Sequence, residues 1–167
     1  ENANALIKEA LARLGFANAW RFLSEVVMRR GAKDTLHYFS LDLSGQKVSR
    51  VKIYVAHRDA SPADLEYAMS QAKEYEPGEV QAFCRSIQGN EERYSAPRST
   101  ETCWAFTSDD DARPYSATMH CPIRCYADND RDALRRIRTV LDPKSHAVLD
   151  RAVWALANRP LDMGVGL

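Results

Sequence analysis

Residues 48–57, VSRVKIYVAH, decide the fold of this 167-residue chain. Apolar and polar residues alternate along this stretch, which is the pattern of a β-strand with two unlike faces. The aliphatic face consists of Val51, Ile53 and Val55, and helices are expected to cover it. The opposite face carries two cations and a phenol, Arg50, Lys52 and Tyr54. Because alternate residues of a strand lie about 7 Å apart, these three side chains form one polar row.

The sequence on either side of this strand predicts pairs of strands that alternate with pairs of helices. Residues 36–43 form the other arm of a hairpin with a turn at 44–47, and a second hairpin follows at 102–107 and 114–121. Apolar residues at helical spacing predict helices at 4–14, 16–29, 62–74, 79–87, 128–141 and 145–158. The fold class is therefore expected to be α+β.

A shift of 66 residues places the second hairpin on the first. The shift pairs Tyr54 with His120 and Lys52 with Thr118. In both copies the strand leads through a short loop containing arginine into a helix with aspartate in its first turn. Such self-similarity indicates a structural repeat. The two αββα units span about 16–74 and 77–141, with flanking helices, in a single domain of residues 1–167.

The polar row at residues 50–54 has two interpretations. On a sheet with one solvated face, cations in such a row are ordinary. In a sheet closed into a barrel with helices outside, the cations point into the lumen, where an anion must offset their charge. A diphosphate matches two cations and a hydroxyl donor. The second unit adds hydrogen-bonding groups to the same face: Ser116, Thr118 and His120.

Composition excludes several classes of protein. Lys plus Arg is 23 and Asp plus Glu is 23, so a general nucleic-acid or membrane-surface binder is not expected. No apolar run approaches the ~18 residues of a membrane span, and the N-terminal residues are too polar for a signal peptide. Four cysteines without a secretory signal predict reduced thiols in a cytoplasmic protein. Both ends are expected to be cuts through a longer protein.

RVKIYV at residues 50–55 and PIRCYADND at 122–130 resemble the dimethylallyltryptophan synthase family of aromatic prenyltransferases, particularly its bacterial members. Members of that family have the ABBA fold, in which repeated αββα units close ten antiparallel strands into a barrel with helices outside. The resemblance covers nearly the whole chain and corresponds to the middle two of the family's five repeats. It implies that the chain forms part of an antiparallel ABBA (PT) barrel.

The resemblance implies transfer of a dimethylallyl (prenyl) group from its diphosphate to an indole or tryptophan-derived acceptor. Arg50 and Lys52 resemble the family's diphosphate-binding cations, and Tyr54 resembles a tyrosine that binds diphosphate and shields the carbocation. Thr118 and His120 stand where the family often has a further lysine and tyrosine, so they are expected to line the lumen.

The resemblance also implies what the enzyme uses and where it acts. Its partners are small molecules, dimethylallyl diphosphate and an indole-type acceptor, with no nucleic acid and no membrane. No cofactor or metal is required, and the pathway is indole alkaloid biosynthesis in secondary metabolism. The rest of the same barrel, including the acidic residue that contacts the indole nitrogen, is expected outside this chain. The isolated chain is therefore expected to be inactive, and no general base is assigned in it.

Two acidic segments and one cysteine-containing segment have rival interpretations. Aspartates at 109–111 and 128–132 are reminiscent of motifs that hold diphosphate through Mg²⁺, but the first lies in a hairpin turn and the second at a helix start. His120 and Cys121 point to opposite faces of one strand, which argues against zinc. None of the three segments is therefore expected to bind a metal.

The remaining conspicuous side chains have structural interpretations. Trp104 is expected either in the core or on the substrate wall. Residues assigned to the core or to structural roles are Trp20, Trp154, His37, His57 and His146, and the last helix is expected to bury Val148, Leu149, Ala152, Val153 and Leu156. An alternative function also remains open, a non-catalytic αβ module that binds an anionic ligand or a partner protein through the basic strand.

Overall fold

The computed structural model describes residues 2–42 and 48–166. Within them an antiparallel four-stranded sheet has the order β1-β2-β3-β4. The strands are β1 (Asp34–Leu41), β2 (Arg50–His57), β3 (Thr100–Thr107) and β4 (Ser116–His120). No strand of the described chain pairs with the outer sides of β1 and β4, so the sheet is open. The predicted turn at 44–47 lies outside the described residues.

Helices precede, separate and follow the two hairpins in the order predicted from the sequence. The α-helices are α1 (Asn2–Arg13), α2 (Ala17–Phe22), α3 (Pro62–Met69), α4 (Glu79–Gln88), α5 (Asp130–Val140) and α6 (His146–Leu156). Short 3₁₀ or π segments are η1 (Leu23–Val27), η2 (Gly31–Lys33), η3 (Ile123–Cys125) and η4 (Pro143–Ser145). The α+β class is confirmed, whereas the division into two repeats stays a prediction.

Local chemistry explains where α3 begins and ends. The Ser61 hydroxyl accepts a hydrogen bond from the backbone N–H of Asp64, whose carboxylate in turn accepts one from the Ser61 N–H, a reciprocal capping box with Pro62 in the first turn. The predicted end near residue 74 is wrong, because the helix stops at Met69. The Arg113 guanidinium donates to the backbone carbonyls of the next turn and so satisfies them outside a helix.

The main apolar core lies on one face of the sheet, against α1, α2, η1 and α3. The sheet contributes aliphatic and aromatic side chains: Val51, Ile53, Val55, Trp104 and Phe106. Trp104 is paired with Ile53 in the ladder and its side chain is 0% exposed, with its ring 5.6 Å from that of Phe22. The interpretation of Trp104 as part of a substrate wall is therefore wrong, because the register puts it on the helix side.

A chain of buried polar groups closes one end of this core. The His57 Nδ1 lies 2.8 Å from Asp34 Oδ1, and its Nε2 lies 2.7 Å from the Thr102 hydroxyl. Asp34 also accepts hydrogen bonds from the guanidinium and backbone N–H of Arg30, while Trp104 Nε1 donates to the Thr102 hydroxyl oxygen. Each of these buried groups is satisfied, and together they fix the ends of β1, β2 and β3 relative to one another.

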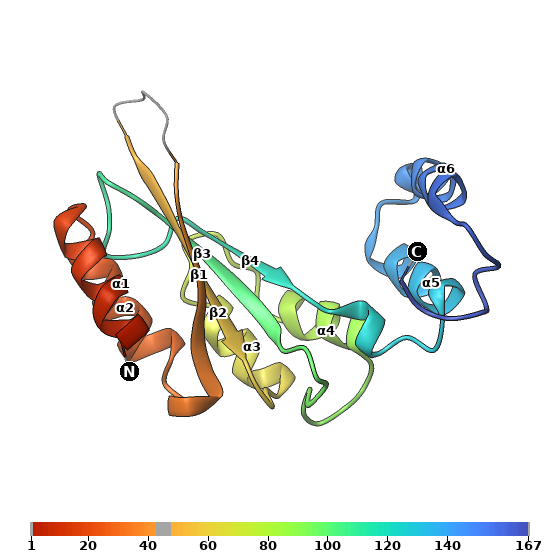
Figure 1. Ribbon diagram of the computed structural model, residues 1–167, viewed down its shortest axis with the longest axis horizontal. Helices are drawn as coiled ribbons and strands as arrows, with labels where there is room; N and C mark the ends of the chain where they lie inside the picture. The colour runs from red at the N-terminus through yellow and green to blue at the C-terminus, as the bar shows by residue number, and fades with distance from the viewer. Residues whose placement is uncertain (1, 43–47, 167) are drawn as a thin grey trace.

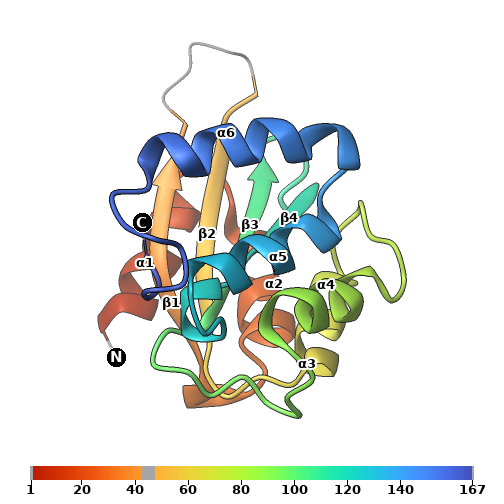
Figure 2. The same cartoon turned by 90° about the vertical axis from the view of Figure 1, so that its right-hand side faces the viewer.

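α5 and α6 lie beyond the β4 side of the sheet, at the right of Figure 1, and in front of the strands in Figure 2. No residue of α6 is buried. The expectation of a buried apolar face on this helix is wrong, since Trp154 is 61% and Leu156 69% exposed and no element of the described chain covers them. Trp20 does pack against the main core, as predicted.

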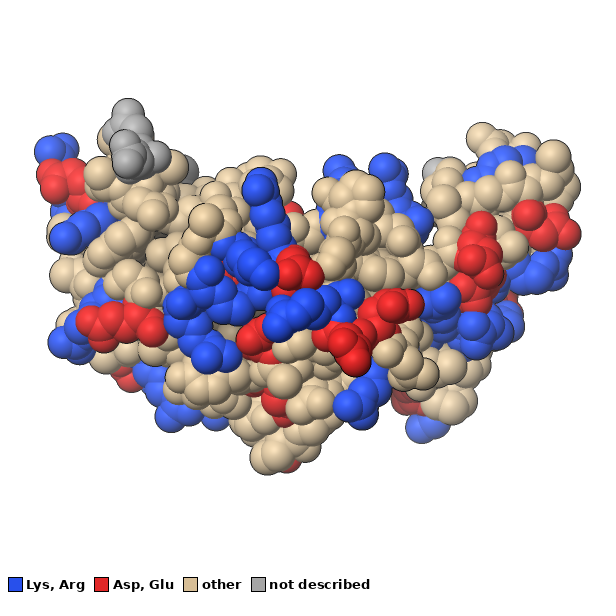
Figure 3. All heavy atoms as spheres, turned by 90° about the horizontal axis from the view of Figure 1, so that it is seen from below, with Lys and Arg blue, Asp and Glu red and all other residues tan. Residues whose placement is uncertain are grey.

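Charges on one face of the molecule are interleaved in sign. The face seen in Figure 3 carries Lys and Arg side chains among Asp and Glu side chains. Ion pairs such as Lys33 with Asp59 and Arg30 with Asp34, both at 2.6 Å, follow this pattern. Of the helices in the described chain, none combines the length and the apolar character that crossing a membrane requires.

Candidate functional site

The register of the sheet gathers the predicted site residues on the face that the core helices leave uncovered. Lys52 is opposite Ala105, which is opposite Ser116, and Tyr54 is opposite Cys103, which is opposite Thr118. The side chains that share this face include Arg50, Lys52, Tyr54, Thr118 and His120. The hydrophobic face of β2 is buried against helices, so the polar row must point the other way.

A cavity of about 300 Å³ lies over this row. It is lined by Arg50, Lys52, Tyr54, Cys103, Ala105, Tyr115, Ser116, Thr118 and His120. The Lys52 side chain has room in it because its ladder neighbours are the small residues Ser40 and Ala105. A volume of this size beside two cations is suited to a small anion with several oxygens.

Arg50 is held from two sides. It forms an ion pair with Asp42 and donates a hydrogen bond from Nη1 to the Tyr115 hydroxyl at 2.9 Å. Hydrogen bonding to Tyr115, and to a smaller extent to Asp42, raises the pKa of Arg50. The Arg50 guanidinium in turn lowers the pKa of Tyr115 below its ordinary value. Arg50 is thus oriented beside the cavity, with part of its charge already offset.

Lys52 is the less compensated of the two cations. Among the described residues no carboxylate oxygen lies within 4.0 Å of its ammonium group, whereas Arg50 has Asp42. A half-buried ammonium without an ion-pair partner attracts an anion more strongly than one already paired. Of the two cations, Lys52 is therefore expected to attract an anion into this cavity more strongly.

Aromatic rings form a row next to the two cations. The ring of Tyr54 lies 5.9 Å from that of Tyr38, edge to face, and 5.8 Å from the imidazole of His120. Hydrogen bonding with the Cys103 side chain, and to a smaller extent burial, raise the pKa of Tyr54. Its hydroxyl therefore stays protonated and can donate a hydrogen bond. Aromatic faces arranged in this way can stabilise a small organic cation.

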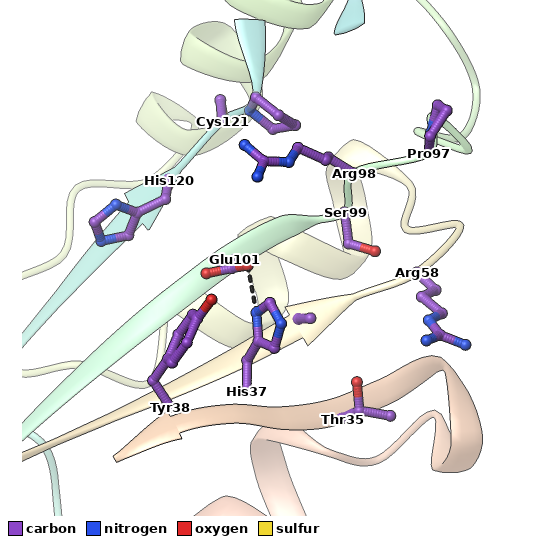
Figure 4. Close-up of a pocket in the computed structure, with 12 residues that line it drawn as sticks. Thr35, His37, Tyr38, Arg58, Pro97, Arg98, Ser99, Glu101, His120 and Cys121 are labelled. Carbon is purple, nitrogen blue, oxygen red and sulfur yellow. Dashed lines mark hydrogen bonds and ion pairs between the residues drawn. The ribbon is translucent and has the colours of Figure 1, made fainter. Parts of the chain in front are cut away.

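A second cavity, of about 540 Å³, adjoins the first at His120, which lines both. In Figure 4, His37 and Tyr38 from β1, Glu101 from β3 and His120 from β4 lie around it. His37 Nδ1 is 2.6 Å from Glu101 Oε1. The two cavities together make a polar and aromatic surface that runs along the uncovered face of the sheet.

Several residues of this surface were not identified from the sequence: His37, Tyr38, Asp42, Glu101 and Tyr115. Alternation through residues 36–43 would have placed Tyr38 and Asp42 with the polar row, so this signal was present. Nothing in the local sequence marks Tyr115. It directly precedes β4, which is separated from β2 by β3, and it meets Arg50 of β2 only in the assembled sheet. His37, assigned a structural role above, belongs to the second cavity.

The acidic segments have structural partners, as their positions in a turn and at a helix start predicted. Asp111 accepts hydrogen bonds from the backbone and side chain of Asn18 in α2, and Asp110 pairs with Lys73 at 2.6 Å. Asn129 caps α5, and Asp132 pairs with arginines of the same helix. Within residues 2–42 and 48–166, no three His, Cys, Asp or Glu side chains come together as metal ligands would.

Neutralising Asp42 should strengthen binding of inorganic pyrophosphate to the chain. The Asp42→Asn change removes the carboxylate that competes for Arg50, and because exposed pairs of this kind are weak, Kd should fall only a few-fold, about 2- to 5-fold. Calorimetric titration measures it. Asp150→Asn, which breaks a remote pair with Arg138, is the matched control and should leave Kd unchanged. Equal affinities for Asp42→Asn and the unmodified chain would contradict the assignment of Arg50 to the anion site.

Comparison with known proteins gives solved structures as matches, and no protein-family model matches the chain. The 6-dimethylallyltryptophan synthase from Micromonospora olivasterospora, in complex with DMASPP and Trp, is 34% identical, with a TM-score of 0.86 over 98% of this chain and 47% of that chain. Prenyltransferase PriB, in a ternary complex with L-tryptophan and dimethylallyl thiolodiphosphate, is 33% identical, with a TM-score of 0.83 over 99% of this chain and 45% of that chain.

The 5-dimethylallyltryptophan synthase from Streptomyces coelicolor is 29% identical, with a TM-score of 0.82 over 98% of this chain and 46% of that chain. The chain therefore spans a little under half the length of the solved relatives it matches. The resemblance inferred from residues 50–55 and 122–130 is confirmed by these matches, which extend over nearly the whole chain. The chain belongs to the dimethylallyltryptophan synthase family of aromatic prenyltransferases.

Proposed function

We propose that this chain supplies the diphosphate-binding part of an enzyme that transfers a dimethylallyl group from its diphosphate to an indole or tryptophan-derived acceptor. The observation that carries the proposal is the match, at 34% identity over 98% of the chain, to a synthase solved with DMASPP and Trp. The cavity over Arg50, Lys52 and Tyr54 supports it, because two cations and a hydroxyl donor suit a diphosphate.

In this proposal the first step is ionisation of the allylic diphosphate. The Lys52 ammonium and the Arg50 guanidinium bind the diphosphate oxygens, and the Tyr54 hydroxyl donates a hydrogen bond. When the carbon–oxygen bond breaks, negative charge grows on the leaving diphosphate and positive charge on the allyl group. Cations that are already in position stabilise the first charge, which lowers the barrier to ionisation.

The second step is capture of the allyl cation by the aromatic acceptor. Tyr38, Tyr54 and His120 present ring faces or edges around the place where that cation forms, and such contacts stabilise it electrostatically. The 540 Å³ cavity beyond His120 has room for an indole ring next to this place. Attack by the ring forms the new carbon–carbon bond, and loss of a ring proton restores aromaticity.

We infer that the complete site is a closed barrel, to which this chain contributes four strands. β1 and β4 have free edges in the described chain, and free edges pair readily with further strands. The uncovered apolar side of α6 is likewise suited to packing against additional structure. Closure would surround the polar face with protein and exclude water that would otherwise quench the allyl cation.

The proposal needs neither a metal nor a cofactor, since protein cations at Arg50 and Lys52 take the role of offsetting diphosphate charge. It also assigns the enzyme to secondary metabolism, in the synthesis of indole alkaloids. Independence from metal is supported by the resemblance and by the charge of the site, whereas the pathway rests on the resemblance alone. Turnover that persists after chelation of divalent cations would support independence from metal.

The test uses a hybrid barrel, defined as the Micromonospora olivasterospora synthase in which this chain replaces the segment it matches. We expect the hybrid barrel to convert dimethylallyl diphosphate and tryptophan to prenylated product, and the isolated chain to form no product above the uncatalysed background. The reason is that an open sheet lacks the remaining wall of the site. Product is measured by chromatography and mass spectrometry.

Circular dichroism and cooperative unfolding must first establish that the hybrid barrel folds. A folded hybrid barrel that binds pyrophosphate without turnover would favour the alternative of a non-catalytic anion-binding module. Clear turnover by the isolated chain would contradict the requirement for a complementing half. The unmodified Micromonospora enzyme is the positive control.

A further inference from the structure

β1 contains a bulge at His37 that brings two consecutive side chains to the same face of the sheet. In the ladder with β2, Leu36 is opposite Val55 and Tyr38 is opposite Tyr54, so His37 is the additional residue between them. Bulges occur often beside active sites, where they redirect a side chain. Here the bulge leaves the consecutive residues His37 and Tyr38 both on the uncovered face, with their rings 4.3 Å apart.

From this position His37 reaches across β2 to β3. Its Nδ1 lies 2.6 Å from Glu101 Oε1, although Ala56 of β2 stands between the two strands, opposite Glu101. The pair can meet because Ala56 offers only a methyl group. His37 and Glu101 thus form an acid–base pair that spans three strands, built on the sheet and not on a loop, and a rigid scaffold of this kind fixes its geometry.

The contact with Glu101 determines which imidazole nitrogen is free. An ionised carboxylate only accepts hydrogen bonds, so Nδ1 of His37 must carry the proton that it donates to Glu101. In the neutral imidazole Nε2 is then unprotonated and able to accept a proton. The same logic orients the histidine of a catalytic triad, where a carboxylate holds the tautomer and stabilises the imidazolium that forms.

The pair borders the place where the new bond would form. The 540 Å³ cavity is lined by His37, Tyr38, Glu101 and His120, and His120 also lines the diphosphate cavity. Tyr38 contacts both His37 and Tyr54 through their rings. An aromatic acceptor in this cavity would therefore lie between the allyl cation and His37.

We propose that His37 is the catalytic proton acceptor of the transfer reaction and that Glu101 is its positioning partner. After the allyl cation adds to the acceptor ring, the ring carbon carries both the new carbon–carbon bond and its original hydrogen. His37 Nε2 takes that proton, and the electron pair of the carbon–hydrogen bond restores the aromatic ring. The products are the prenylated ring, diphosphate and a proton held on His37 until solvent removes it.

The charges around the cavity explain why the histidine needs a carboxylate. Arg58 and Arg98 also line it, and in Figure 4 the Arg98 side chain extends toward Cys121 over the cavity while Arg58 points away. A cationic imidazolium that shares the cavity with Arg98 is unfavourable, and the Glu101 carboxylate offsets it. Because this inference rests on the proposed function, its tests separate the two.

The first test determines the tautomer of His37 in the isolated chain by ¹⁵N-resolved NMR of its imidazole. We expect the proton on Nδ1 in the unmodified chain and a shift toward the Nε2-protonated form in Glu101→Ala. His146, which lies in α6 away from the cavities, serves as an internal reference whose signals should not change. A proton on His37 Nε2 in the unmodified chain would overturn the inference, since no base would then face the cavity.

The second test measures turnover and the isotope effect of a ring-deuterated acceptor in the hybrid barrel. With His37 present, proton loss is expected to be fast and the isotope effect close to unity. His37→Gln should lower turnover about 10²-fold, as removal of a general base does, and should raise the isotope effect to a primary one because proton loss becomes limiting. Glu101→Gln should also lower turnover and raise the isotope effect, but by less than His37→Gln. His146→Gln is the matched control.

The outcomes distinguish the two proposals. An active hybrid barrel in which His37→Gln keeps both its turnover and an isotope effect near unity would overturn this inference and leave the proposed function standing. Reduced turnover without an isotope effect would also overturn it, because that pattern indicates a structural or binding role. A folded but inactive hybrid barrel would overturn the proposed function, and this inference with it.

Discussion

Replacing Lys52 with alanine is expected to lower the turnover number of the hybrid barrel by about 10²–10³-fold. Lys52 lines the 300 Å³ cavity between small ladder neighbours, and among the described residues no carboxylate pairs with it. Its charge is therefore available to the leaving diphosphate. Since that charge increases as the carbon–oxygen bond breaks, the loss should appear mainly in turnover and less in the apparent constant for the donor.

Replacing Arg50 with alanine should lower the turnover number less, because Asp42 already offsets part of the Arg50 charge. Steady-state kinetics with varied dimethylallyl diphosphate at saturating acceptor separate the two parameters. Lys52→Arg keeps the charge and should retain more activity than Lys52→Ala, without restoring it, because the planar guanidinium presents its donors differently. Lys144→Ala, at an exposed lysine in η4, is the control. Turnover for Lys52→Ala within a few-fold of the parent would show that diphosphate departure does not depend on this cation.

Alternation was sufficient to predict the polar row, because the two faces of β2 differ so clearly. Val51, Ile53 and Val55 are buried, whereas Arg50, Lys52 and Tyr54 are not, which is what a two-residue period encodes. The same rule could not orient β3. Its residues 102–106 are buried on both faces, so the sequence alone does not say whether Trp104 faces the helices or the cavity. Pairing with Ile53 decides it, and pairing is a property of the assembled sheet.

The acid–base pair could not be predicted for a related reason. His37 belongs to a bulge, and an added residue shifts the alternation of the strand that contains it. Glu101 is 64 residues away in the sequence and meets His37 only because Ala56 leaves room between them. For α6, the apolar pattern predicted a helix correctly, but a pattern cannot say what covers it. Local periodicity thus identified the elements, whereas contacts among three strands define the site.

Removing the Asp34 carboxylate is expected to destabilise the chain by about 3–5 kcal/mol, the cost of breaking a buried ion pair by deleting one partner. The side chain of Asp34 is 1% exposed and accepts hydrogen bonds from Arg30 and His57. In Asp34→Ala both partners stay in place and lose their acceptor, so an uncompensated guanidinium and an unsatisfied imidazole remain at the end of the sheet. Urea unfolding at neutral pH measures the difference.

The Asp34 carboxylate also makes the free-energy difference between the parent and Asp34→Ala depend on pH, in a direction that its pKa fixes. Burial alone would raise the pKa of Asp34, but hydrogen bonds from His57 and Arg30 outweigh it and hold the pKa below its ordinary value. A group whose folded pKa is lowered stabilises the fold fully above its unfolded pKa, about 3.9, and this stabilisation is lost as the pH falls through the folded pKa. The difference in free energy of unfolding between the parent and Asp34→Ala should therefore be constant near neutral pH and become smaller in acid.

Asp150→Ala supplies the control for this comparison. It also removes an aspartate that pairs with an arginine, but the Asp150–Arg138 pair is partly exposed, and pairs of that kind contribute at most about 1 kcal/mol. Its effect should be small at every pH. If Asp34→Ala destabilised the chain no more than Asp150→Ala, the buried chain from Arg30 through Asp34 to His57 would not hold the strand ends together. The positions of His37 and Lys52, which those strands carry, would then need another explanation.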